Sequence, residues 1–254
     1  MKISEVIEII EQYAPIPLAD EGDRPKVGLQ MGNRNAECTG VVTCLDATLD
    51  VLKIAVENGC NMVVSHHPMI YYPLQKIDES EVKGEEIAYA FRNGITVYSA
   101  HTNFDKCEIG TNASLVKMFK GKIIDTFECC FVAEVASISL GDLAKKVADV
   151  LQDKSVKVIG DLDKTITKFA VCSGGGGSAY SYFNYARENA DVYISGDMPH
   201  HMYLEVANRG FSAIEFSHYA SEIMAEDVFH SILENKVKVI KANQHCPFRT
   251  LEEI

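Results

Sequence analysis

The stretch GVVTCLDATLDVLKIAVENGCNMVVSHHP, residues 40–68, decides the fold class. Its first seven residues predict a buried strand, and residues 47–59 carry an amphipathic helical pattern that Gly59 ends. Residues 61–68 predict a second, β-branched strand that Pro68 stops. A strand, a helix and another strand at this spacing form a βαβ unit, in which the two strands run parallel.

Outward from this stretch, the alternation of strands and helices continues in both directions. In the first half, the patterns predict helices at 3–13 and 80–93 and a strand at 95–101. In the second half, they predict strands at 168–177, 191–197 and 211–218 and helices at 178–190 and 202–210. Between the halves, a strand at 131–139, a helix at 141–152 and a strand at 155–161 form a short extra unit. The sequence therefore predicts an α/β fold with mostly parallel sheets.

A weak sequence similarity between two parts of the chain favours duplicated halves. Glu57-Asn58-Gly59 precedes NMVVSHH, and Glu188-Asn189-Ala190 precedes DVYISGD. Chance similarity between two βαβ units is the alternative interpretation. We expect a single domain over residues 1–254, with approximate halves 1–125 and 126–254, because no linker rich in Pro, Ser or Gly separates them.

Composition and charge exclude several classes of function. The chain is 47% hydrophobic and 24% charged, which is typical of a globular protein, and its net charge of −12 repels phosphate backbones, so nucleic acid is an unfavourable partner. No run reaches the roughly 18 apolar residues of a membrane-spanning helix. Glu5, Glu8 and Glu11 interrupt the first apolar pattern, unlike a signal peptide. Scattered cysteines without a C-x-x-C pair then indicate a cytoplasmic protein with reduced, mostly buried thiols.

Imidazoles and carboxylates stand at the ends of the predicted strands in the first half. His66 and His67 end one strand, His101 ends the next, and Asp105 follows one helical turn later. Taken alone, the histidines are explained better by a satisfied polar strand end, and Asp105 could simply cap a helix. Because the carboxyl ends of parallel strands meet at one sheet edge, their coincidence indicates a site.

The second half shows the same feature. Asp197, followed by His200-His201, ends one predicted strand, and His218 ends the last with Glu222 four residues later. His218 and Glu222 share a helix face at this spacing, which is also what a simple surface pair would show.

Adjacent histidines can both bind metal only where a strand ends and bends, and they then reach different ions more naturally than one. A second ion needs further donors, which Asp105, His218 and Glu222 supply, with Glu222 able to bridge both ions. The predicted ligands are therefore His66, His67, Asp105, His218 and Glu222. This mixed set suits two divalent ions among Zn²⁺, Fe²⁺, Mn²⁺ and Ni²⁺, rather than Ca²⁺.

The glycine run Gly174–Gly177 follows a strand and opens a helix. Its amides, with Gly174 and Gly175 first, could cradle a phosphate, although the run lacks the Lys-Ser/Thr ending of a P-loop. A tight turn beside the metal site is the alternative interpretation.

Five motifs, in order, resemble those of the GTP cyclohydrolase 1 type 2 family, also called the NIF-three-like proteins. They are SHHP (65–68), HTNFD (101–105), VCSGGGGS (171–178), SGDMPHH (195–201) and SHYASE (217–222). The chain departs from the family's usual pattern at Ser217, where glycine is common, and at His200, where tyrosine is common. It also looks too short between Asp125 and Val171 for the domain that many relatives insert between the halves.

The resemblance implies two related α/β halves that face a shared dinuclear metal site, assembled as a hexameric ring, with the five ligands given above. It also implies a metal-dependent hydrolase that opens the guanine imidazole ring of GTP by hydroxide attack at C8 and releases formate. His101 and His201 are then candidates for proton transfer, Asp197 for orienting one of them or binding substrate, and Gly174 and Gly175 for substrate binding.

Two alternatives stay open. The first is a ring-forming metal-binding or regulatory protein without turnover, because binding and catalysis need the same ligands. The second is phosphoester hydrolysis at the same site, which the glycine loop and the two ions suggest.

Overall fold

The computed structural model describes residues 1–251, and the chain divides into two compact units. The first contains Met1–Gly110 and Ile223–His245, and the second contains Thr111–Glu222 and the chain from Cys246 onward. The sequence placed the halves at 1–125 and 126–254. The structure divides the chain at Gly110 instead and returns Ile223–His245 to the first unit. A single domain without an insertion stays a prediction.

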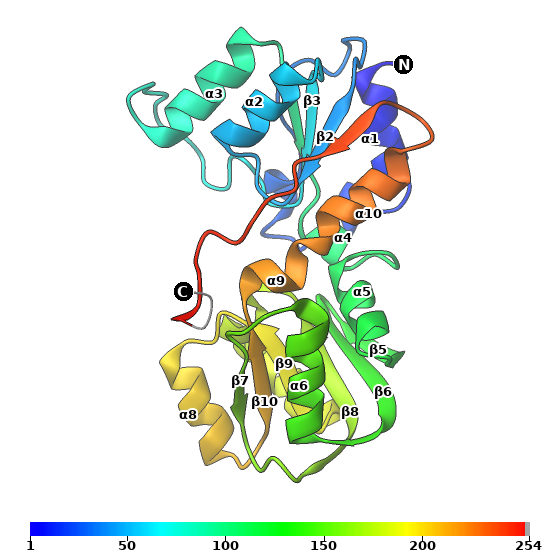
Figure 1. The fold of residues 1–254 in the computed structure, drawn as a ribbon, viewed down its shortest axis with the longest axis vertical. Helices are drawn as coiled ribbons and strands as arrows, with labels where there is room; N and C mark the ends of the chain where they lie inside the picture. The colour runs from blue at the N-terminus through cyan, green and yellow to red at the C-terminus, as the bar shows by residue number, and fades with distance from the viewer. Residues whose placement is uncertain (252–254) are drawn as a thin grey trace. The chain divides into compact units, whose positions relative to one another are not determined.

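The first unit contains a five-stranded sheet in the order β1-β4-β3-β2-β11. Figure 1 labels two of its central strands, β2 and β3. The described strands are β1 (Gly28–Met31), β2 (Val41–Cys44), β3 (Met62–Ser65), β4 (Thr96–Ser99) and β11 (Val239–Lys241). The helices and 3-10 turns are α1 (Ile3–Glu11), η1 (Ile16–Leu18), η2 (Arg24–Lys26), α2 (Leu49–Glu57), α3 (Val82–Arg92), α4 (Thr102–Asp105) and α10 (Met224–Leu233). β11, β2, β3 and β4 run parallel, whereas β1 pairs antiparallel with β4.

Helices cover both faces of this sheet, because alternate residues of a strand point to opposite faces. Val41 and Met62 pack in one apolar cluster with residues of α1 and α10. Val42 and Val63, the next residue in each strand, pack in a second cluster with residues of α2 and α3. The central strands are therefore buried on both sides, which explains why they read as continuous apolar runs in the sequence.

The second unit contains a six-stranded sheet in the order β5-β6-β8-β9-β10-β7 (Figure 1). The strands are β5 (Lys122–Phe127), β6 (Cys130–Ser139), β7 (Lys157–Ile159), β8 (Thr165–Cys172), β9 (Val192–Gly196) and β10 (Ala213–Phe216). The helices are α5 (Thr111–Met118), α6 (Leu140–Leu151), α7 (Tyr180–Asn189), α8 (His200–Asn208) and α9 (His218–Glu222), with a 3-10 turn η3 (Gly174–Ser178). One apolar cluster joins alternate strand residues such as Ala170 and Tyr193 to α7 and α8.

The two sheets share a topology. Three consecutive strands run parallel in each, β2-β3-β4 and β8-β9-β10, and an earlier strand, β1 or β7, pairs antiparallel with the third. The predicted α/β fold with two related halves is confirmed. The second sheet is more mixed than the sequence indicated, because β5 and β6 form an antiparallel pair that extends it beyond β8.

The parallel strands end where the sequence placed its polar residues. His66 follows β3, His101 lies two residues beyond β4, Asp197 follows β9 and His218 lies two residues beyond β10. Six of the cysteines are buried, as predicted. Within residues 1–251, none of the helices combines the length and the apolar composition that a membrane span requires.

Candidate metal centre

The adjacent histidines of the first unit stand on a bend that the end of β3 creates. The Ser65 hydroxyl donates to the His67 carbonyl at 2.8 Å and lies 2.7 Å from the Ser99 hydroxyl. The backbone therefore turns directly after the strand, as two adjacent ligands require. The rings of His66 and His67 lie on the same side of this bend, with centroids 5.1 Å apart.

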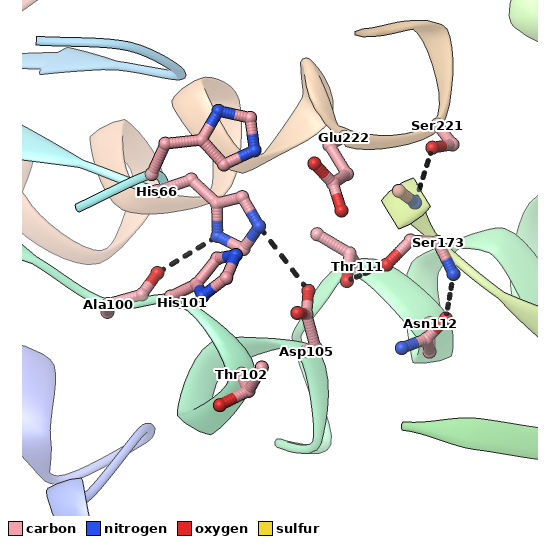
Figure 2. Close-up of polar contacts among 12 residues, drawn as sticks. His66, Ala100, His101, Thr102, Asp105, Thr111, Asn112, Ser173, Ser221 and Glu222 are labelled. Carbon is pink, nitrogen blue, oxygen red and sulfur yellow. Dashed lines mark hydrogen bonds and ion pairs between the residues drawn. The ribbon is translucent and has the colours of Figure 1, made fainter. Parts of the chain in front are cut away.

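Helix α4 brings a carboxylate to His66. The His101 carbonyl accepts hydrogen bonds from the amides of Phe104 and Asp105, so that Asp105 lies one turn beyond His101, as predicted. Its Oδ1 is 3.5 Å from Nε2 of His66, and both side chains are buried (Figure 2). Asn103 anchors the helix from its other side, since its side-chain amide donates to the Ala14 carbonyl at 2.7 Å.

The two adjacent imidazoles each donate the Nδ1 proton to a fixed acceptor. His66 donates to the Ala100 carbonyl at 2.9 Å, as Figure 2 shows, and His67 donates to Oδ1 of Asp46 at 2.8 Å. A neutral imidazole that donates from Nδ1 keeps its lone pair on Nε2. Such second partners orient metal-binding histidines and raise their basicity.

The loop that carries Asp46 is held by a residue far along the chain. Gln244 accepts hydrogen bonds from the amides of Leu45 and Asp46 at 2.8 and 2.9 Å and donates to the Asp46 carbonyl at 3.0 Å. Glu226 accepts from the Asn243 amide at 2.7 Å, and burial raises the pKa of this glutamate although that hydrogen bond lowers it. The last part of the first unit therefore fixes the partner of His67.

The second unit carries its own histidine and carboxylate set. On α9, Nε2 of His218 lies 2.9 Å from Oε2 of Glu222, and its Nδ1 lies 2.7 Å from Oδ2 of Asp197. Burial alone would lower the pKa of His218, but the two carboxylates raise it to about 10 in the metal-free protein. A proton then occupies the space between His218 and Glu222 that a metal ion shared by both side chains would take.

Asp197 makes a contact with His218 that the sequence did not suggest, and its predicted roles stay predictions. It was expected to orient His101 or His201, or to bind substrate. In the structure it is the partner of His218, and its backbone adopts a left-handed conformation with φ of 53° directly after β9. Only a few non-glycine residues, aspartate among them, adopt this conformation at modest cost.

The glycine loop packs directly against the carboxylate of Glu222. A Cβ atom at Gly174, whose φ is +56°, would lie 2.1 Å from Oε1 of Glu222. The Gly174 amide donates to the Ser221 hydroxyl at 2.9 Å, and the Ser173 amide donates to Oδ1 of Asn112 at 2.7 Å (Figure 2). These contacts favour the interpretation as a tight turn beside the site over phosphate binding by the Gly174 amide. Gly175 lies near Asp197, with 3.7 Å from its ideal Cβ position to Oδ2.

A pocket opens beside His218 within the second unit. Its volume is about 260 Å³. The lining residues are Ser155, Lys157, Asp197, Glu215, Phe216, Ser217, His218 and Phe248. His201, by contrast, is exposed at the start of α8 and stacks on Tyr180, with ring centroids 6.0 Å apart, so its proposed role in proton transfer stays a prediction.

The donors of each unit fit a transition-metal ion. The first unit offers imidazole nitrogens whose protons are committed elsewhere and a buried carboxylate, and the second offers an imidazole and a carboxylate one helical turn apart. Nitrogen and oxygen donors of this kind suit Zn²⁺, Fe²⁺, Mn²⁺ or Ni²⁺. These His, Asp and Glu groups could therefore hold metal. That the donors of the two units bind the same metal ions stays a prediction.

Two sheets with a common topology, each followed at its strand ends by histidines and carboxylates, define a class of α/β protein with groups that could hold a metal ion at those ends. Residues 1–248 match the family model described as Duf34/NIF3 (NGG1p interacting factor 3), and the chain belongs to this family. The predicted resemblance is confirmed.

Individual relatives support the same assignment. A protein of Clostridium acetobutylicum named GTP cyclohydrolase 1 type 2 homolog is 31% identical over 96% of this chain and 93% of its own length. The hypothetical protein SA1388 of Staphylococcus aureus has a similar structure, with a TM-score of 0.88, 25% identity and 99% of both chains covered. The structure titled reduced HcgD from Methanocaldococcus jannaschii is also similar, with a TM-score of 0.84 and 30% sequence identity. The match covers 96% of this chain and 98% of that one.

Two supporting carboxylates were missed by the sequence reasoning. Asp46 was visible in principle, since it is the last residue of the predicted strand 40–46, which precedes the strand that ends in His66 and His67. Asp23, which bonds His101, lies in a turn without periodicity and 78 residues from its partner. No local pattern could have connected these two residues.

Proposed function

We propose that this chain is a metal-dependent hydrolase that uses two divalent ions, held by His66, His67, Asp105, His218 and Glu222. The observation that carries the proposal is that the histidines of this set each have a fixed partner on Nδ1, which directs Nε2 toward a ligand. A histidine that only filled a polar strand end would not need this arrangement in every case.

Glu222 is the residue that joins the two donor sets in this proposal. A carboxylate has two oxygens, so it can serve two ions at once, and its burial beside Gly174 keeps it in one place. When bound, two such metal ions would lower the pKa of a water molecule and stabilise the negative charge that develops on the reacting oxygen. The histidines and Asp105 set where that water is held.

The pocket beside His218 is the proposed place for the substrate. Phe216 and Phe248 offer apolar surface, and Lys157, Ser155 and Ser217 offer polar groups. A volume of about 260 Å³ suits a nucleobase better than a whole nucleotide. Together with the naming of the relatives, this favours a purine ring as the reacting group. One water would add at C8 and the C8–N9 bond would break to open the imidazole ring, and a second water would hydrolyse the resulting formamide to formate and a free amine.

The experiment combines metal analysis with an assay for formate. The purified chain should contain two metal ions and release formate from GTP. Asp105→Ala should lower the metal content and should reduce the rate of turnover by at least about 100-fold. Asp149→Ala, an exposed aspartate on α6, is the matched control. Full activity in the Asp105 variant would overturn the assignment.

The same measurements separate the alternatives. A protein that holds metal but turns over neither GTP nor a panel of other nucleotides and phosphodiesters is a metal-binding or regulatory protein. Phosphoester hydrolysis has weaker support, because the Gly174 amide that would contact phosphate already donates to Ser221. The hexameric ring, the nucleotide partner and the cytoplasmic location stay predictions.

A further inference from the structure

Lys157 and Glu215 stand opposite each other on two strands that border the pocket of the second unit. β7 pairs antiparallel with β10, and Lys157 is the direct cross-strand partner of Glu215. Figure 1 labels these two strands beside each other. Nζ of Lys157 lies 2.8 Å from Oε2 of Glu215 and 2.9 Å from the hydroxyl oxygen of Tyr203, which α8 carries. These three side chains form one hydrogen-bonded group, the lysine cluster.

The ammonium group of Lys157 has one more donor than the lysine cluster uses. A lysine carries three N–H donors. Glu215 and Tyr203 accept two of them, since Tyr203 donates its own hydroxyl proton to Oε2 of Glu215. The lysine side chain is 60% exposed and lines the pocket. The hydrogen bonds of Glu215 and Tyr203 raise the pKa of Lys157 to about 12, so the group stays protonated and can donate to a ligand.

The other polar side chains that line the pocket have committed their protons within the protein. The Ser155 hydroxyl donates to Oδ1 of Asp153 at 2.6 Å, and the Ser217 hydroxyl is a further partner of the same carboxylate. Both ring nitrogens of His218 lie against carboxylates. Lys157 is therefore the lining side chain that offers a donor to a ligand, and the ligand must present an acceptor to it.

The charge of the lining favours a neutral acceptor over an anion. The eight lining residues include one lysine, no arginine and two carboxylates, those of Asp197 and Glu215. Glu215 is buried and neutralises Lys157, and the Met198 amide, which donates to its Oε1 at 3.0 Å, holds it in place. A phosphate group would gain little net attraction from this set and would be repelled by Asp197. A carbonyl oxygen on an uncharged ring meets no such penalty.

We infer that Lys157 binds the carbonyl oxygen of a 6-oxopurine ring and that the phosphates of a nucleotide contribute little to binding in this pocket. The inference rests on the proposed function, since it takes the pocket beside His218 as the place of the substrate. The remaining N–H of Lys157 donates to the carbonyl oxygen, and Glu215 and Tyr203 are positioning residues that hold Nζ in place. A 6-aminopurine presents an N–H donor at the same position, so the ammonium group would lose a water molecule without gaining an acceptor.

The test measures nucleoside binding by calorimetry in a chelator, so that neither metal nor turnover is needed. Inosine carries a 6-oxopurine and adenosine a 6-aminopurine. The wild-type chain should bind inosine at least about 10-fold more tightly than adenosine, because a site built around a donor rejects an analogue that lacks the acceptor. Lys157→Met should bring the two affinities to within about 2-fold of each other. Lys145→Met, at an exposed lysine on α6, is the matched control and should keep the preference.

A second variant tests the positioning role of the lysine cluster. Tyr203→Phe removes one acceptor of Nζ and should reduce the preference for inosine by about 3-fold or more. If the lysine cluster only joined β7 to β10, this variant would change the melting temperature and leave the ratio of the two affinities unchanged. Thermal melting of each variant identifies any that is unfolded.

Two measurements on the wild-type chain do not depend on any substitution. Purine riboside has a hydrogen atom in place of the carbonyl oxygen, so it should bind as weakly as adenosine. Inosine triphosphate should bind no more than about 3-fold more tightly than inosine in the chelator, because the pocket offers its phosphates no net positive charge.

Three results would overturn the inference. They are a wild-type chain without a preference for inosine, a preference that survives Lys157→Met, and a triphosphate that binds more than about 3-fold more tightly than the nucleoside. The last result would assign Lys157 to a phosphate group. Failure of the proposed hydrolase looks different, because GTP would then release no formate while the preference for inosine stayed intact.

Discussion

A Cβ atom placed on Gly174 would lie 2.1 Å from Oε1 of Glu222 and 3.1 Å from Nε2 of His218. These two side chains are the proposed ligands of the second unit. The glycine therefore does more than permit a turn, because its missing side chain leaves the space that the carboxylate occupies.

Gly174→Ala should destabilise the protein and weaken metal binding together. The left-handed conformation at φ +56° costs an alanine roughly 1–2 kcal/mol, and Glu222 would also have to move. We expect a total loss above about 2 kcal/mol in the free energy of unfolding, measured with urea. Gly175→Ala is the control, since a Cβ atom at Gly175 would lie 3.7 Å from Oδ2 of Asp197, an ordinary van der Waals distance. Equal behaviour of the two variants would contradict this packing argument.

The metal-free protein should lose stability as pH rises from about 6.5 to 10. The carboxylates of Asp197 and Glu222 raise the pKa of His218 from its ordinary 6.5 to about 10. A group whose pKa is higher in the folded state stabilises it fully below the unfolded pKa and ceases to do so above the folded one. Thermal melting in a chelator should show the decline for wild type, and His218→Gln should flatten it. The control is His201→Gln, and a decline unchanged in His218→Gln would count against the prediction.

Gln244→Ala should affect both stability and the metal site. Its side chain accepts from the amides of Leu45 and Asp46, and both would lose this acceptor. We expect a cost of about 1–3 kcal/mol by urea unfolding. Because Asp46 orients His67, Zn²⁺ affinity should fall as well. Gln12→Ala, an exposed glutamine at the end of α1, should change neither quantity. An affinity that survives the Gln244 substitution would show that Asp46 needs no support.

The sequence predicted the elements that have a periodic apolar pattern and the polar residues that follow the strands. β3 with His66 and His67, and α9 with His218 and Glu222, were found because apolar runs mark the strands and polar residues follow them. The strands β1, β5 and β11 were missed. β11 has three half-buried residues and pairs with β2, about 200 positions earlier, so neither its pattern nor its neighbourhood is local.

The supporting contacts of the site show the same limit. Asp23 reaches His101 across 78 residues, and Gln244 reaches Asp46 across 198. Such pairs depend on where the turns of a folded unit come together. A periodic pattern reports only which face of a strand or helix is buried. The candidate metal ligands could therefore be named from the sequence, whereas distant supporting residues such as Asp23 and Gln244 could not.

Substitutions at Asp197 should separate its backbone role from its side-chain role. The residue combines a φ of 53° with a carboxylate bonded to Nδ1 of His218. Asp197→Gly relieves the backbone but removes the acceptor, so Zn²⁺ affinity should fall about 10- to 100-fold with little loss of stability. Asp197→Asn tolerates the conformation and keeps an oxygen acceptor, so it should retain most of the affinity. Asp197→Ala lacks both properties and should lose stability as well. If the glycine variant bound Zn²⁺ like wild type, the carboxylate would serve the turn after β9 and not the metal ligand.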